Sequence, residues 1–190
     1  CVADGSANPK WIAADLLSQA EHDPRAAVFL ITPDKDFGLA VQKEMEKQMK
    51  ELSRYEIMKS SVDQYAKAFL CKDAEQCFDI VNKIAPEHLE VELPDPKKYL
   101  PLIYNAGAIF LGKYTSEPIG DYMAGPNHTL PTSGTAAFSS PLGVYDFVKH
   151  SSVECYSEEA FRKISKKVQL FAKAEGLTAH AHAMEVRDED

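Results

Sequence analysis

The sequence predicts an α/β fold in which a parallel sheet lies between helices and a small helical appendage follows. Short apolar runs alternate with helical patterns up to residue 111. Runs such as residues 27–32 and 108–111 are typical of strands buried on both faces, which occur mainly in parallel sheets. No strand pattern follows Pro141. Together these observations predict a Rossmann-like parallel sheet with flanking helices and a C-terminal helical appendage.

Length, charge and cysteine usage exclude several classes of protein. A chain of 190 residues with 45% hydrophobic content can form one sizeable domain, or a domain with an appendage. The net charge of -8, without clustered Lys and Arg, argues against a nucleic-acid partner. No apolar run reaches the ~20 residues of a membrane helix, and no signal-peptide pattern is present. The four cysteines lack any Cys-x-x-Cys spacing, so we expect a soluble protein in the reducing cytoplasm, without a membrane partner.

The first residues read as the end of a buried strand, residues 1–3, followed by turn-forming residues. A core strand is rarely a terminus, so we expect the 190 residues to be the later part of a longer polypeptide. A cleaved tag is the alternative. Residues 9–22 are predicted to form a helix, because apolar side chains recur at helical spacing and Pro9 suits the first turn.

The following elements alternate between strands and helices. Strands are expected at residues 27–32, 66–70, 88–91 and 108–111. Helices are expected at residues 34–54, 73–84 and 95–105. Ligands bind at the carboxyl ends of the strands in sheets of this kind. We therefore expect Glu87, His88 and the loop after Leu111 to lie near a site at the carboxyl ends of the strands.

The stretch of residues 112–141 is rich in Gly, Pro, Ser and Thr, and long segments of this kind are usually functional loops. Beyond it we expect a helix at residues 157–173 and a last short helix that contains His180. The predicted domains are therefore a Rossmann-like catalytic domain at residues 1–141, the second part of a longer domain, and a helical dimerisation tail at residues 142–190.

Two pairs of polar residues are candidates for chemistry. Gln19 and His22 lie three apart on one helix face, which suits two ligands of one metal ion. A single helical histidine is more often a surface or core residue, and glutamine is an uncommon zinc ligand. Glu87 and His88 precede a strand, where a carboxylate and an imidazole can divide acid and base duties. The alternative for this pair is an exposed turn.

Further candidates lie in the long loop and in the tail. Asp121 and His128 belong to the loop, where such residues are usually solvated. His180 and His182 alternate, so on a helix only one of them suits a shared metal ion. The string that begins at Gly107 approaches a phosphate-binding loop, but an apolar strand fills its middle and argues against nucleoside triphosphate binding.

Several ordered strings give the chain a specific resemblance, unlike any one of them alone. They are Asp15-Leu16-Leu17-Ser18-Gln19-Ala20-Glu21-His22, Ile84-Ala85-Pro86-Glu87-His88-Leu89, Asn105-Ala106-Gly107-Ala108-Ile109-Phe110-Leu111-Gly112, Gly120-Asp121-Tyr122, Ala124-Gly125-Pro126-Asn127-His128, Leu130-Pro131-Thr132-Ser133-Gly134-Thr135-Ala136 and Ala174-Glu175-Gly176-Leu177-Thr178-Ala179-His180. Over nearly its whole length the chain resembles the histidinol dehydrogenases. The resemblance favours the functional interpretation of each candidate residue.

The resemblance assigns roles to residues of this chain. It implies four zinc ligands, which are Gln19, His22, Asp121 and His180. It implies a substrate-binding set, which is Gln19, His22, His88, Asp121, His128, Glu175 and His180. His88 is then the base that takes the hydroxyl proton, and Glu87 activates water against the aldehyde.

The resemblance also implies a reaction and an assembly. The family removes two hydrides from L-histidinol in NAD-dependent steps, while zinc holds and orients the substrate. Its members are domain-exchanged homodimers, so His180 and Glu175 are expected to act in the partner's site. Most of the NAD-binding surface belongs to a half that this chain lacks, so no cofactor-binding residue is assigned. A zinc-binding or small-molecule-binding module without redox activity is the alternative.

Overall fold

The computed structural model describes residues 1–189 and divides them into two compact units. The first unit is Cys1–Phe147, and the second begins at Val148. From the sequence we placed the boundary after residue 141. The division into a catalytic domain and a dimerisation tail stays a prediction, and each unit is described by itself below.

The first unit is built on a five-stranded, all-parallel sheet. Its strands are β1 (Val2–Ala3), β2 (Phe29–Thr32), β3 (Lys67–Leu70), β4 (His88–Glu92) and β5 (Ala108–Leu111). They lie in the order β3-β2-β1-β4-β5. The chain adds β2 and β3 on one side of β1 and then crosses to add β4 and β5 on the other side. This confirms the predicted parallel α/β fold.

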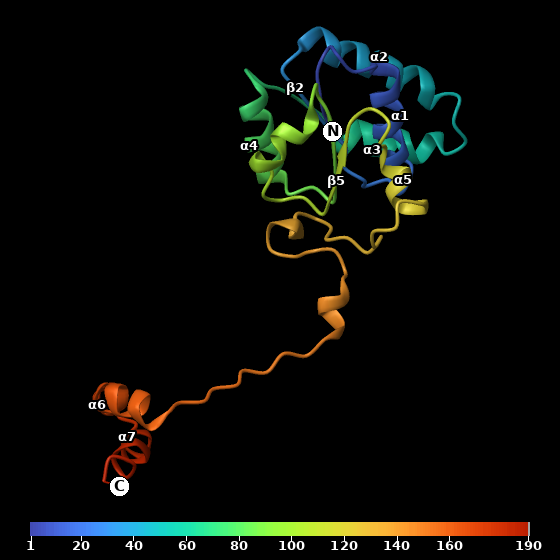
Figure 1. Ribbon diagram of the computed structural model, residues 1–190. Coiled ribbons are helices and arrows are strands. Elements are labelled where there is room, and N and C mark those ends of the chain that lie inside the picture. Colours follow the sequence, from blue (N-terminus) through green and yellow to red (C-terminus); the bar gives the residue numbers. More distant parts are fainter. Residues whose placement is uncertain (190) are drawn as a thin grey trace. The chain divides into compact units, whose positions relative to one another are not determined.

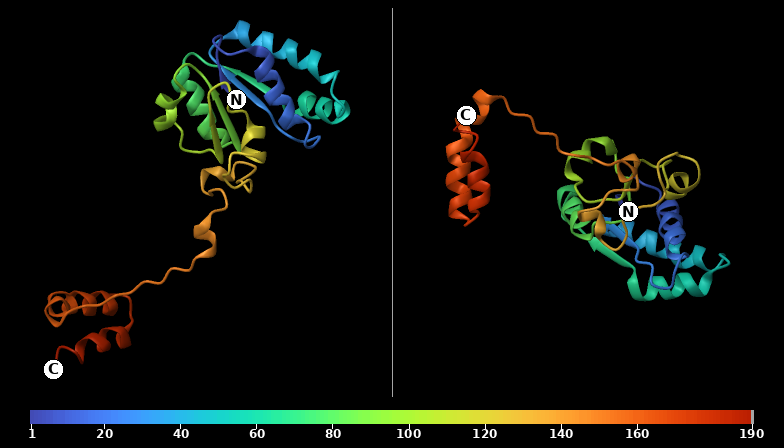
Figure 2. Two further views of the ribbon diagram at one scale, coloured as in Figure 1. Left: turned by 45° about the vertical axis from the view of Figure 1, so that its right-hand side comes forward. Right: turned by 90° about the horizontal axis from the view of Figure 1, so that it is seen from below.

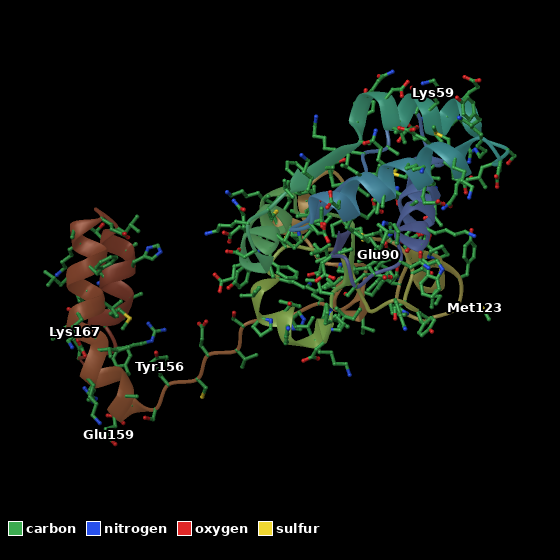
Figure 3. All side chains as sticks on the ribbon, turned by 90° about the horizontal axis from the view of Figure 1, so that it is seen from above. Lys59, Glu90, Met123, Tyr156, Glu159 and Lys167 are labelled. Atoms are coloured by element: carbon green, nitrogen blue, oxygen red, sulfur yellow. The ribbon has the colours of Figure 1, made fainter. Side chains whose placement is uncertain are left out.

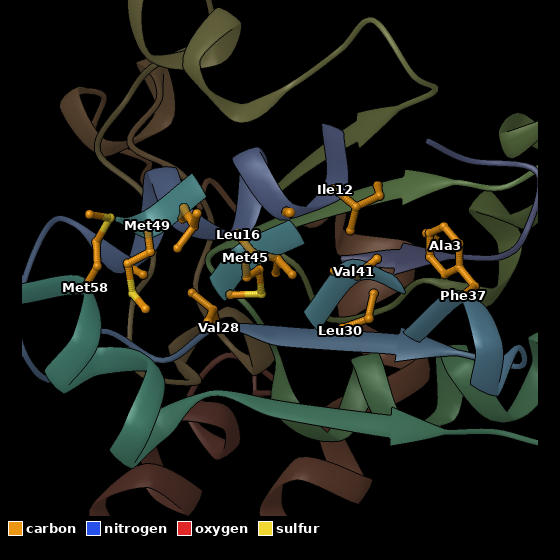
Figure 4. Close-up of a cluster of buried hydrophobic side chains, with 13 residues drawn as sticks. Ala3, Ile12, Leu16, Val28, Leu30, Phe37, Val41, Met45, Met49 and Met58 are labelled. Carbon is orange, nitrogen blue, oxygen red and sulfur yellow. The ribbon is translucent and has the colours of Figure 1, made fainter. Parts of the chain in front are cut away.

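Helices cover both faces of the sheet, with α4 on one side and α1, α2 and α3 on the other (Figure 1). Their bounds are α1 (Pro9–Ala20), α2 (Lys35–Met49), α3 (Tyr55–Tyr65) and α4 (Ala74–Ile84). Because side chains alternate along a strand, Ala3 packs toward α1 and α2, whereas Val2 packs toward α4. Figure 4 shows the first of these two cores, where Val41 of α2 lies beside Leu30 of β2.

Side chains at the helix ends explain where the helices begin. The Asn8 side chain accepts a hydrogen bond from the backbone N–H of Lys10, and Asp34 does the same for Phe37. Asp73 caps α4 in the same way. Each cap satisfies a backbone donor that the first turn leaves free, which contributes about 1 kcal/mol.

Three predictions about the elements were wrong. The helix expected at residues 34–54 ends at Met49, and a separate helix, α3, follows it. The helix expected at residues 95–105 is a 3-10 helix, η1 (Pro96–Leu102), because Pro101 inside it has no N–H to donate to an α-helical bond. The long segment after β5 is not all loop, since it contains a short helix, α5 (Glu117–Tyr122), and the 3-10 turn η2 (Thr135–Ala137).

The second unit contains two helices, α6 (Glu158–Ala174) and α7 (Thr178–Glu185), which lie side by side in Figure 2. Gly176 adopts a positive φ of 75° between them, a conformation that glycine reaches without strain. The carboxylate of Asp188 accepts hydrogen bonds from Ser165 and Gln169, which fastens the end of the unit to α6. Residues 1–189 contain no helix with the length and apolar character needed to cross a membrane.

Replacing Phe78 tests the core between α4 and the sheet. The Phe78 ring is 1% exposed and stacks on Tyr99 at a centroid distance of 5.1 Å. We expect Phe78→Ala to lower the free energy of unfolding by about 3–5 kcal/mol, because it leaves a cavity that the surroundings only partly fill. Chemical denaturation measures this loss. Tyr104→Ala is the control, since Tyr104 is 76% exposed, and an equal loss in both variants would contradict the packing described here.

Candidate functional site

The candidate residues of the first unit gather at the amino ends of the strands. His88 is the first residue of β4, so Glu87 and His88 precede their strand. Helix α1 runs back against the strand direction and ends at Ala20, so Gln19 lies in its last turn and His22 follows it in a turn at the same edge. The expectation that Gln19 and His22 share one helix face is therefore wrong. The carboxyl-end location that we expected for Glu87 and His88 is therefore wrong. The strand pattern located β4 correctly, but these residues stand before it and not after it.

Strand β4 presents an unusual polar row on one of its faces. Leu89 and Val91 point into the core beneath α4, and the alternate residues His88, Glu90 and Glu92 point to the other face. Glu92 pairs in register with Ala3, which belongs to the core beneath α1. Glu90 and Glu92 are only 8% and 6% exposed, although carboxylates are rarely buried without a functional or structural reason.

Helix α5 lies over this polar row. Its first backbone N–H, that of Glu117, donates a hydrogen bond of 2.9 Å to the Glu90 carboxylate. Gly120 packs against the ring of Phe110, the residue of β5 that pairs in register with Glu90. These two contacts bring the side chains of Glu117 and Asp121 to His88.

The resulting cluster has three potential ligand groups close together. Ligand atoms of His88, Glu117 and Asp121 lie within 4.8 Å of one another. The Glu117 Oε1 atom is 3.8 Å from His88 Nε2, and Asp121 Oδ1 is 2.7 Å from His128 Nδ1. His88 Nε2 and Glu117 Oε1 are buried and have no hydrogen-bond partner among residues 1–189. Buried polar atoms of this kind call for a cation or a polar ligand.

Charge in the cluster is set by burial and by close neighbours. Burial raises the pKa of Glu117 to about 8, and the neighbouring Asp121 carboxyl adds to the rise. Burial alone would also raise the pKa of Asp121, but hydrogen bonds from Glu117 and His128 outweigh it and keep that pKa below its usual range. The two carboxyls therefore share one proton, which Glu117 keeps.

The base candidates respond to the same environment. Burial lowers the pKa of His88, so its imidazole is neutral near pH 7 and can accept a proton. Burial raises the pKa of Glu87, which favours proton uptake by its carboxylate. Both residues line a cavity of about 590 Å³, together with Gln19, Glu90 and Glu117. The cavity is large enough for a small polar molecule.

Comparison with known proteins decides the family. A sequence model described as histidinol dehydrogenase matches residues 1–188. The chain belongs to the histidinol dehydrogenase family. It is 52% identical over 189 residues to the histidinol dehydrogenase of Aquifex aeolicus and 53% identical over 189 residues to that of Listeria monocytogenes serotype 4b. In both comparisons the alignment covers 100% of this chain and 44% of the relative, so the chain spans less than half of their length.

A solved structure supports the same family. The crystal structure of histidinol dehydrogenase from Elizabethkingia anophelis matches with a TM-score of 0.90 and 36% identity. The match covers 99% of this chain and 43% of that one. The family resemblance expected from the sequence is thereby confirmed. The roles of individual residues stay predictions.

The structure brings some of the predicted site residues together. Glu87 and His88 are close enough to His22, Asp121 and His128 for these groups to influence their pKa values. Gln19 lines the same cavity as Glu87 and His88. His180, on α7, and Glu175, the residue that ends α6, belong to the second unit and are exposed there.

The donor chemistry of the first unit fits a zinc ion. Gln19 offers an amide oxygen, His22 an imidazole nitrogen and Asp121 a charged carboxylate, all of which are oxygen or nitrogen donors that zinc accepts. His22 is exposed and Gln19 is half-buried, so both can reach a ligand. The partnerless polar atoms of the cluster beside Asp121 agree with a cationic occupant.

Sequence reasoning missed Glu90 and Glu117. Both are buried, and both orient parts of the site, yet neither stood out as a motif. A signal for Glu117 was present in Ser116-Glu117-Pro118, because a serine followed by an early proline is typical of a helix start. A helix there places Glu117 and Asp121 four residues apart on one face.

Replacing Asp15 tests the electrostatics of the buried acids. Burial raises the pKa of Asp15 to about 7, and the nearby carboxylates of Glu90 and Glu92 add to the rise. The folded chain then binds more protons than the unfolded chain between about pH 4 and pH 7, so the free energy of unfolding falls as pH rises through this range. We expect Asp15→Asn to reduce that fall.

Denaturation at pH 4.5 and at pH 8 measures the effect. Asp36→Asn is the matched control, because Asp36 is exposed on α2, and it should keep the pH dependence of the parent chain. Equal pH dependence in the parent chain and in Asp15→Asn would show that the Asp15 pKa is not raised by burial and by the nearby carboxylates of Glu90 and Glu92.

Proposed function

We propose that this chain forms part of an NAD-dependent, zinc-requiring histidinol dehydrogenase. The enzyme oxidises L-histidinol through the aldehyde to L-histidine, in the last steps of histidine biosynthesis in the cytoplasm. Membership of the family supports this function. The observation that carries it is His88, a neutral imidazole at the wall of a cavity that Glu87 and Glu117 also line, with a carboxylate oxygen of Asp121 within 4.8 Å of the ligand atoms of His88 and Glu117.

His88 acts as the base in the proposed mechanism. Its imidazole takes the hydroxyl proton of the alcohol when the hydride leaves, because burial keeps the ring unprotonated. Glu87 takes a proton from the water that attacks the aldehyde carbon. The two groups are consecutive in the chain and line one cavity, so both can serve one reacting carbon in successive steps. NAD supplies the oxidising equivalent, and no residue of this chain is assigned to its binding.

Four side chains would hold the zinc ion. Gln19, His22 and Asp121 come from the first unit, and His180 comes from the second. Zinc would hold and orient the amino alcohol. Asp121 is the charged member of its carboxyl pair, which suits a metal ligand. His128 positions the Asp121 carboxylate through its 2.7 Å contact, and it would also meet the substrate.

A domain-exchanged homodimer would complete the site. In this proposal residues 142–190 form the dimerisation tail, and His180 and Glu175 act in the partner's site. Large apolar side chains on the second unit support the proposal, because Val153 is 92% exposed, Leu170 72% and Phe171 69%. Apolar surface of this extent usually has a partner.

Substitution of His88 and Glu87 in the full-length protein tests the reaction. We expect His88→Asn to lower kcat for histidinol oxidation by about 10²- to 10⁴-fold, since a general base contributes rate enhancement of that order. Glu87→Gln should slow the second oxidation more than the first, because only the second consumes water. NADH formation from histidinol and from the aldehyde separates the two steps. A full-length protein that binds zinc but forms no NADH would favour the module without redox activity.

The two histidines of α7 provide a matched pair for the metal. We expect His180→Asn to lower the zinc content of the full-length protein and His182→Asn to leave it unchanged, because the two side chains point about 200° apart on the helix. Metal analysis of the purified variants measures the content. Equal zinc in all three proteins would remove His180 from the ligand set.

A further inference from the structure

Glu90 joins the strand that begins with His88 to the short helix that carries Asp121. It lies on β4 two residues after His88 and on the same face of the strand. Its carboxylate accepts the first backbone N–H of α5, the helix that contains Asp121. We propose that Glu90 is a positioning residue, which holds α5 in place and so fixes Asp121 and Glu117 against His88.

Helix α5 depends on this bond because it has no cap of its own. The helix has six residues, and the Ser116 side chain at its start makes no capping hydrogen bond. A helix this short is not stable by itself. The Glu90 side chain supplies an acceptor oxygen from a distant strand to a backbone N–H that the first turn leaves free.

A second contact fixes the other end of the helix. A Cβ atom at Gly120 would lie 2.6 Å from Cε1 of Phe110, so glycine lets α5 approach the strand closely. Phe110 is the register partner of Glu90 across β4 and β5. The helix is therefore seated on one pair of facing residues, and Asp121 follows Gly120 directly.

Glu90 lines the cavity, but its Oε1 atom is already engaged by the backbone N–H of α5. Glu90 is 8% exposed, and its bond to Glu117 is itself buried. Figure 3 labels Glu90 in the interior of the first unit, whereas the labelled Met123, just beyond α5, is 88% exposed. A carboxylate held in this way orients the backbone of α5 and leaves the reacting groups to Glu87 and His88.

Glu92 offers a matched control on the same strand face. It is 6% exposed, and its Oε2 atom has no hydrogen-bond partner. Removal of Glu92 deletes a buried carboxyl group without removing a bond to α5. Any effect common to Glu90 and Glu92 variants therefore reflects burial of charge, and an effect confined to Glu90 reflects positioning.

The experiment compares Glu90→Gln, Glu90→Leu and Glu92→Leu in the full-length protein. Amide hydrogen exchange at Glu117 reports the bond directly, and chelator competition with zinc alone reports the affinity of the metal site. We expect Glu90→Leu to speed exchange at Glu117 and to weaken zinc binding by about 10- to 100-fold, the usual cost of losing a residue that orients a metal ligand. Glu90→Gln should preserve both, because its amide oxygen accepts the same hydrogen bond, and Glu92→Leu should preserve both as well.

The zinc readout rests on the proposed function, whereas the exchange readout does not. Faster exchange at Glu117 in a protein that binds no zinc would support the positioning role and defeat the proposed metal site. Unchanged exchange in Glu90→Leu, or equal losses in Glu92→Leu, would overturn the positioning role. If Glu90→Leu does not fold, Gly120→Ala replaces it, because the added Cβ clashes with Phe110 and displaces α5. The proposal then requires Gly120→Ala to weaken zinc binding and Glu90→Gln to leave zinc binding unchanged.

Discussion

The alternation of side chains along β4 is the constraint on which the site depends. One face of this strand carries Leu89 and Val91 and completes the core beneath α4. The other face carries His88, Glu90 and Glu92. Glu90 and Glu92 are buried there, so their side chains are held in a defined position. Because the apolar face fixes the register of the strand, it also fixes the polar row. His88, the proposed base, and Glu90, the proposed positioning residue, are thus placed by packing on the opposite side of the sheet.

The position of the site follows from the chain connections around this strand. Glu87 and His88 lie before β4, and α1 returns to the amino edge, so the candidate groups collect at the end of the sheet opposite the usual one. The segment after β5 closes the site by laying α5 back across the polar face. A short helix such as α5 can therefore form a site at the amino edge of the sheet, although the strand order alone predicts a site at the carboxyl edge.

Particular residues show how far the sequence could lead. The apolar runs located β2 and β5, and β4 was located by its short alternating pattern. The expectation that residues 108–111 are buried on both faces was wrong, because β5 is an edge strand in which Ile109 is 39% exposed. The apolar runs did not reveal α3, in which Met58 and Ser61 are the buried residues and Tyr55 and Val62 pack only partly against the core, a pattern too sparse to produce a clear period. The ordered motifs identified Glu87, His88 and Asp121 through resemblance.

Other parts of the site depend on contacts between distant residues. Glu90 and Glu117 are 27 residues apart, and nothing in either local sequence predicts that a side chain of one would cap the helix that begins at the other. The amino-edge location likewise follows from the direction of α1 and not from any motif. Propensity and periodicity describe patterns over a few neighbouring residues, so they cannot predict a hydrogen bond between residues that are far apart in the sequence.

The unsatisfied atoms link the stability of the first unit to its ligand. Among the residues that the structure describes, His88 Nε2 and Glu117 Oε1 are buried without hydrogen-bond partners, and leaving such an atom unpaired costs about 1–3 kcal/mol. A ligand that satisfies both recovers this cost only when α5 is seated, so binding and seating of the helix stabilise each other. The Glu90 bond acts before the ligand arrives, because it orders the helix while the polar atoms still lack partners. Part of the conformational entropy lost in ordering α5 is therefore lost during folding and not during ligand binding. More of the interaction energy between the ligand and the site then contributes to affinity.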